Sequence, residues 1–132
     1  MSIPTPERML RHRPPALLVD AVLAYTGTSI TCSARGEGPW PWPRLLEGAA
    51  QAAGLLAGLQ PDGLTNTAVI AEYRNVVVHA ASSAGPVRFT AEVERRLMRF
   101  WRCRLAAHAS DVLLLEGIVT LAPPSDGTES GR

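Results

Sequence analysis

The segment from Arg44 to Leu59 constrains the fold most, because it reads as a helix that is apolar on nearly every side. It is filled with Ala and Leu, which favour helices most, and it ends before Pro61-Asp62-Gly63. Pro43 suits the first helical position. A 3.6-residue repeat leaves one narrow stripe of other residues: Glu47, Gln51, Gly54 and Gly58. Other elements must surround such a helix, and a polar pair remains on an otherwise buried rod.

The rest of the chain reads as strands joined by turns. Two candidate strands precede the helix and four follow it: Ala16–Tyr25, Ser29–Arg35, Ala68–His79, Val87–Leu97, Trp101–His108 and Val112–Ala122. The segment Gly36–Pro43 (GEGPWPWP) reads as a loop, because its glycines and prolines suit neither a helix nor a central strand.

Alternation assigns faces to two of these strands. Apolar residues occupy the odd positions of Val87–Val93 and of Trp101–Ala107, while polar or charged residues fill most even positions. A hairpin turn at Met98–Phe100 places Glu92 and Glu94 opposite the arginines of the next strand, on the face exposed to solvent.

The order of elements predicts the fold class. Two strands, a buried helix and four further strands are accommodated by one antiparallel sheet that curls around a central helix, which is the α+β hotdog layout. We expect a single domain over residues 1–122 and a loose polar tail over 123–132. One sheet leaves a strand edge open, so we expect two chains to pair edge to edge.

Composition excludes several functional classes. The 132 residues are 46% hydrophobic and carry a net charge of +1, which indicates one compact domain without the bulk charge that gathers nucleic acid. The apolar segments are too short or too interrupted for a transmembrane helix of about 20 residues, and the first residues lack the apolar region of a secretory signal. We therefore expect a cytoplasmic protein that binds no membrane.

The cysteines and histidines predict no metal site. Cys32 and Cys103 lie in apolar patterns and read as buried thiols. The three histidines, His12, His79 and His108, show no ligand spacing. We expect His12 to fix the N-terminal segment by hydrogen bonds and His108 to lie at the surface.

Two motifs carry a resemblance to a known family. The run HRPPALLVD over residues 12–20 and the run LEGAAQ over residues 46–51 resemble the HRxPxLLVD and EAMAQ signatures of the 3-hydroxyacyl-acyl-carrier-protein dehydratases of fatty-acid synthesis. The resemblance covers roughly residues 9–122. Those enzymes have a histidine in the loop before the helix, whereas GEGPWPWP has none. In this respect the sequence resembles the divergent dehydratase-like hotdog proteins of aryl-polyene pathways, in which a Trp-containing loop precedes the helix. Those proteins have a histidine near the end of the next strand, and His79 matches that position.

The resemblance implies a substrate and partners. The substrate is an acyl group carried on the phosphopantetheine of acyl carrier protein, the chain needs no other cofactor, and it pairs with itself or with a second hotdog subunit. Dehydration of a 3-hydroxyacyl thioester requires a base, an acid and donors to the carbonyl oxygen. Burial on the helix favours the protonated form of Glu47, which makes it the candidate acid. The candidate base is His79 or a histidine of the partner.

Further residues are predicted around the acid. Gln51, one turn along the helix, orients the carboxylate, and amides of the first helical turn, with Gly48 beside them, polarise the carbonyl. Trp40 and Trp42 line the mouth of an acyl tunnel, or else pack in the core or at an interface.

Two alternative functions, and two interpretations of one group of arginines, stay open at this point. In the first alternative function, the chain is a catalytically weak subunit that binds acyl chains or supports a catalytic partner. In the second, it is a thioesterase in which Glu47 alone directs water. The arginines of the last hairpin meet an acidic carrier protein or a phosphate, or they lie on a solvated sheet face with Glu92 and Glu94; they are Arg95, Arg96, Arg99, Arg102 and Arg104.

Overall fold

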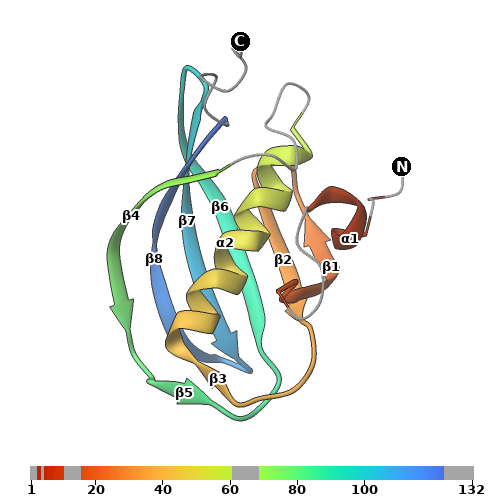
Figure 1. Ribbon diagram of the computed structural model, residues 1–132, viewed down its shortest axis with the longest axis vertical. Helices are drawn as coiled ribbons and strands as arrows, with labels where there is room; N and C mark the ends of the chain where they lie inside the picture. The colour runs from red at the N-terminus through yellow and green to blue at the C-terminus, as the bar shows by residue number, and fades with distance from the viewer. Residues whose placement is uncertain (1–2, 4, 11–15, 61–68, 124–132) are drawn as a thin grey trace.

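The computed structural model describes residues 3, 5–10, 16–60 and 69–123, and it shows one long helix packed into a curved sheet (Figure 1). The helices are α1 (Pro6–Met9) and α2 (Trp42–Gly58). The long strands are β1 (Val19–Tyr25), β2 (Ser29–Ala34), β4 (Val69–Val78), β6 (Arg88–Leu97), β7 (Phe100–Ala109) and β8 (Val112–Ala122). Two short strands, β3 (Trp40–Pro41) and β5 (Ser82–Ser83), pair with each other.

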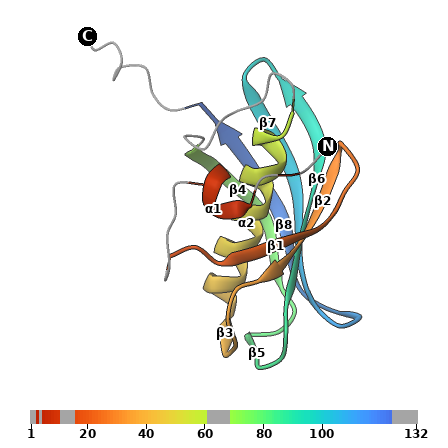
Figure 2. The same cartoon turned by 90° about the vertical axis from the view of Figure 1, so that its right-hand side faces the viewer.

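The long strands form a six-stranded antiparallel sheet in the order β1-β2-β6-β7-β8-β4. Figure 2 shows the sheet from its side, with α2 lying along its concave face and α1 beside α2. The predicted layout of one antiparallel sheet around one helix is confirmed.

The core lies between α2 and the concave face of the sheet. Most of α2 is buried, as expected of a helix without a broad polar face. The odd positions of β6 and β7 that were predicted to face inward are buried from Val87 to Ala91 and from Trp101 to Ala107. Burial of apolar surface at about 25 cal/mol per Å² is the main force that holds the helix in the sheet.

In the β6–β7 hairpin, acidic residues lie opposite arginines on the outer face, as predicted. Glu92 lies opposite Arg104, whose guanidinium also reaches Glu94 at 3.1 Å. The turn is shorter than predicted, because Phe100 already belongs to β7.

Two local predictions were wrong. The segment Gly36–Pro43 is not all loop: Trp40 and Pro41 pair with Ser83 and Ser82, which is a contact between residues more than 40 positions apart and leaves no local pattern. The first strand begins at Val19 instead of Ala16, and the three residues before it pass over α2.

Candidate functional site

Glu47 lies in the second turn of α2 and is half-buried. The helix begins at Trp42, one residue before Pro43, which was expected at the first helical position. The favourable field of the helix N-terminus weakens beyond the first turn. The surroundings of Glu47 are therefore set by the elements packed near it more than by the helix dipole.

The start of α2 offers fewer free amides than the sequence predicts. The four unsatisfied N–H positions of this helix start are residues 41–44. Pro41 and Pro43 have no N–H group, and the Trp42 N–H donates to the Ala81 carbonyl oxygen at 2.9 Å. Of the four positions, this leaves the Arg44 amide to polarise a carbonyl.

Tyr73 is a site residue that the sequence analysis missed. It pairs with Val119 of β8, which is fully buried, so that its side chain lies on the concave face, where it is half-buried against the core. Burial and, to a lesser extent, the charge of Glu47 raise the pKa of Tyr73 to about 12. Tyr73 therefore keeps its proton and is a hydrogen-bond donor near the Glu47 carboxylate. No local pattern in the strand signals this role, because it depends on which strand packs beside α2.

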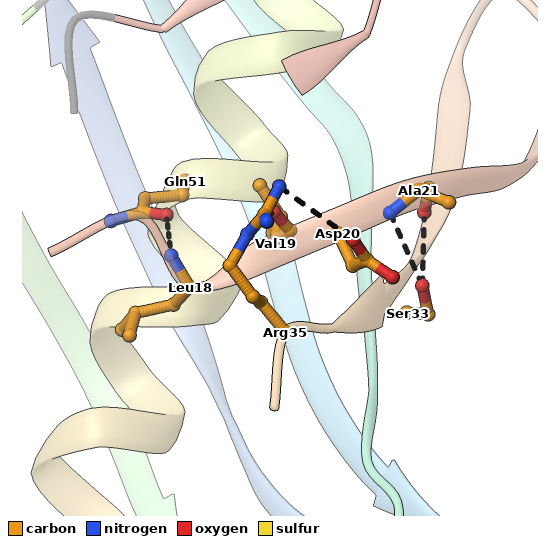
Figure 3. Close-up of polar contacts among 7 residues, drawn as sticks. All are labelled: Leu18, Val19, Asp20, Ala21, Ser33, Arg35 and Gln51. Atoms are coloured by element: carbon orange, nitrogen blue, oxygen red, sulfur yellow. Dashed lines mark hydrogen bonds and ion pairs between the residues drawn. The ribbon is translucent and has the colours of Figure 1, made fainter. Parts of the chain in front are cut away.

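Gln51 is buried, and its carboxamide binds the backbone (Figure 3). The Leu18 N–H donates to its Oε1 at 2.8 Å, and its Nε2 donates to the Ala16 carbonyl oxygen at 2.8 Å. These bonds tie the segment before β1 to the helix. The motif glutamine thus holds the backbone of the other motif, whose last residue, Asp20, lies 3.6 Å from Arg35.

Trp40 and Gly48 belong to the core. Trp40 is fully buried, with its ring edge-to-face on Phe89 at 5.7 Å and the Arg44 guanidinium 4.1 Å from its centroid. Gly48 is buried directly beneath the Phe89 ring. In the isolated chain neither residue presents a surface to a ligand, whereas Trp42 is 41% exposed at the start of α2.

One face of α2 is only partly covered by its own chain. Leu46, Glu47, Gly54 and Gly58 are half-buried, whereas the other residues of α2 from Leu45 onward are buried. The nearby edge strand β4 carries exposed apolar side chains: Val69, Ile70, Val77 and Val78. Glu47 thus lies beside a region where another surface can pack.

His79 lies away from Glu47. It follows β4, is 40% exposed, and its Nε2 lies 2.8 Å from Oε2 of Glu116. Glu116 alternates with the buried residues Leu115 and Gly117, so it lies on the convex face of the sheet. Within one chain, the structure does not bring the two predicted catalytic residues together.

Other sequence predictions concern thiols, metals and membranes. Cys32 and Cys103 are buried, and burial raises the pKa of each thiol to about 12. The described residues contain no cluster of three or more His, Cys, Asp or Glu side chains that would hold a metal ion. Within the same ranges, no helix is both long and apolar enough to cross a membrane. His12 and the expected tail after residue 123 lie outside the described residues.

Comparison with solved structures identifies the fold. A chain of the dehydratase heterocomplex ApeI:P from Xenorhabdus doucetiae superposes with a TM-score of 0.81 at 14% identity, over 99% of this chain and 100% of that one. The protein has the hotdog fold. A conserved protein, PA5202, from Pseudomonas aeruginosa matches this hotdog chain at TM-score 0.68 and 19% identity, over 90% and 98% of the two chains.

Another hotdog neighbour is named for a different activity. A mutant thioesterase, PA1618, from Pseudomonas aeruginosa matches this hotdog chain at TM-score 0.58 and 15% identity, over 78% of this chain and 81% of that chain. No protein-family model matches the sequence, and neither does any curated protein.

Proposed function

We propose that this hotdog chain dehydrates 3-hydroxyacyl thioesters carried on acyl carrier protein, as one subunit of a hotdog dimer. The observation that carries the proposal is the position of Glu47, a half-buried carboxylate next to a protonated tyrosine on the open face of an apolar helix. The similarity to a chain of a dehydratase heterocomplex and the two sequence motifs support it. The same features favour the aryl-polyene type of dehydratase-like subunit over the fatty-acid type, because the loop before the helix lacks a histidine.

The proposed reaction removes water across two adjacent carbons. A base takes a proton from C2, beside the thioester carbonyl, and the electron pair forms the C2–C3 double bond. The C3–O bond breaks, and the Glu47 carboxyl group, as the proposed acid, gives a proton to the leaving hydroxyl group, which departs as water. Tyr73, whose pKa is raised to about 12, keeps its proton and is available as a hydrogen-bond donor near Glu47. The chain itself needs no metal or other cofactor for these steps.

The base is a histidine of the partner subunit. His79 of the same chain is held by Glu116 on the convex face of the sheet. The open face of α2 and the apolar edge of β4 are where a second hotdog subunit completes the site. Trp42, exposed at the start of α2, is the proposed tunnel-mouth residue, while Trp40, Gly48 and Gln51 support the site from within the core.

The decisive experiment compares two carboxylate variants with a 3-hydroxyacyl carrier protein as substrate. Glu47→Gln removes the proposed acid and is expected to lower the rate of enoyl formation by about 100-fold or more. Glu92→Gln is the matched control, because Glu92 is an exposed carboxylate on the outer face, bonded to Arg104. Equal activity of Glu47→Gln and the wild type would remove the assignment.

Two further readouts separate the alternative functions. Enoyl formation only after addition of a second hotdog protein supports a heterodimer, and His79→Ala then leaves the rate unchanged if the partner supplies the base. Release of free thiol without an enoyl product supports a thioesterase, in which Glu47 directs water to the carbonyl.

A further inference from the structure

The end of the β6–β7 hairpin is an exposed surface of arginines and large apolar residues. Figure 1 shows it extending past the end of α2, away from the start of the helix. Leu97 and Phe100 are about half exposed, and Met98, at the turn, is 88% exposed. We call the surface formed by Arg95, Leu97, Met98, Arg99, Phe100 and Arg102 the hairpin end.

Two arginines of the hairpin end lie directly opposite each other. Arg95 of β6 pairs with Arg102 of β7, which in turn lies beside Thr120 of β8. These three residues line a shallow pocket together with Leu97 and Phe100. Like charges at directly opposed positions of a sheet repel each other, so the pair is an energetic cost to the isolated chain.

The part of the chain that the structure describes does not neutralise this charge. Arg104, two residues farther along β7, binds both Glu92 and Glu94. Among the residues that the structure describes, no carboxylate lies within 4.0 Å of Arg95, Arg99 or Arg102. The pocket between the two arginines therefore offers positive charge to a carboxylate, and the described residues supply none there.

We propose that the hairpin end docks the acidic surface of the carrier protein that brings the thioester, an inference that rests on the proposed function. A carboxylate of the carrier occupies the pocket between Arg95 and Arg102, where charge-assisted bonds to guanidinium groups are strong. Apolar side chains of the carrier cover Leu97, Met98 and Phe100. Arg, Met and aromatic residues are the types enriched where proteins bind each other. The charge is local, because the whole chain carries only +1, so it orients a partner instead of attracting any polyanion.

The position of the hairpin end agrees with this role. The start of α2 lies near the end of β4, because the Trp42 N–H donates to the carbonyl oxygen of Ala81, just after that strand. The hairpin end lies near the start of β4, because Leu121 of β8 pairs with Ile70 on one side and with Trp101 of β7 on the other. Two chains joined antiparallel through β4 bring the hairpin end of each to the end of the assembly where the helix of its partner begins. A docked carrier then lies at the same end of the dimer as the partner's helix start.

The test compares one acyl group on three carriers, using the protein with whatever partner subunit its activity requires. The substrates are the 3-hydroxyacyl carrier protein and the same acyl group on free phosphopantetheine and on pantetheine. Arg102→Glu is expected to raise KM for the carrier protein about tenfold and to leave kcat and both small substrates unchanged. Added salt should raise the KM of the wild type for the carrier protein toward the KM of the variant.

Arg88→Glu is the matched control, since Arg88 starts β6 at the far end of the same sheet face from the turn. A rise in KM with Arg88→Glu equal to that with Arg102→Glu would overturn the proposal, because the effect would then be one of general charge. A defect that also appears with phosphopantetheine but not pantetheine would overturn it in favour of a phosphate site.

Direct binding keeps the docking proposal separate from the proposed function. Fluorescence anisotropy of labelled carrier protein measures docking without turnover. If no substrate is converted, the proposed function fails, while loss of binding in Arg102→Glu alone still supports docking. If the wild type binds anionic lipid vesicles through Arg102 and does not bind the carrier protein, the docking proposal is wrong.

Discussion

At the scale of single residues, Gly48 and Gly54 have different reasons for lacking a side chain. A Cβ on Gly48 would lie 2.2 Å from the Phe89 ring, whereas a Cβ on Gly54 would meet only Leu10, at 3.4 Å. Gly48 therefore lets β6 approach the helix, and Gly54 is not required by packing. The closely packed Phe89 ring at Gly48 sets the distance between the sheet and the helix that carries Glu47, the proposed acid.

The first prediction uses this pair. Gly48→Ala is expected to destabilise the protein by about 2 kcal/mol, because overpacking outweighs the helix preference of Ala. Gly54→Ala is expected to stabilise it by up to about 1 kcal/mol. Urea unfolding measures both, and a Gly48→Ala variant as stable as Gly54→Ala would contradict the packing argument.

The second prediction concerns pH and the two buried thiols. Their folded pKa of about 12 lies above the ordinary value of 9.0, so the native state keeps protons that the unfolded state releases. The thiols therefore do not lower the free energy of unfolding below pH 9, and they lower it progressively as the pH rises from 9 toward 12. At pH 10 each thiol should cost about 1 kcal/mol of stability relative to pH 8.

Urea unfolding at the two pH values gives the measurement. The double variant Cys32→Ala, Cys103→Ala should show a smaller loss of stability between pH 8 and pH 10 than the wild type, whatever its stability at pH 8. Equal losses would show that other groups cause the alkaline decline.

At the scale of elements, α2 and the segment before β1 are held together by Gln51. The third prediction is that Gln51→Leu destabilises the protein by about 2 kcal/mol, since it leaves the Leu18 N–H buried without its acceptor. Hydrogen exchange at the Leu18 amide should accelerate in this variant. Gln60→Ala is the control: Gln60 also bonds a backbone oxygen, Gly27 at 2.8 Å, but it lies beyond the helix and is half-buried. Unchanged protection of the Leu18 amide in Gln51→Leu would contradict the role of Gln51 in holding the segment before β1 on α2.

The sequence predicts elements well where a pattern repeats locally. Alternation in β6 and β7 predicted the inward faces and the position of acidic residues opposite arginines on the outer face, because side chains on a strand alternate with a period of two. The β3–β5 pair was not predicted, since each strand has two residues and the pairing joins distant segments. Tyr73 was missed for the same reason: its neighbour Glu47 comes from another element.

At the scale of the whole molecule, the edge strand β4 remains open. This strand carries four exposed apolar residues, and a long apolar strand edge pairs readily with another chain. A second hotdog subunit is the partner that we propose for this edge.

The fourth prediction tests that edge. The wild-type chain, or its complex with a second hotdog subunit, is expected to have the mass of a dimer in light scattering, and Val78→Glu is expected to shift it to the monomer. Val112→Glu is the control, because Val112 is 60% exposed at the start of β8, away from the edge. Retention of the dimer in Val78→Glu would place the interface elsewhere.

The sequence by itself determined that one apolar helix lies inside one antiparallel sheet, because burial of hydrophobic surface requires a cover for every side of such a helix. It also singled out Glu47 and Gln51 as the polar exceptions on that helix. Only the tertiary structure decided what these residues do, since hydrogen-bond partners come from segments distant in the chain. It directs Gln51 to the backbone at Ala16 and Leu18, places Tyr73 near Glu47, and holds His79 on the opposite face of the sheet with Glu116.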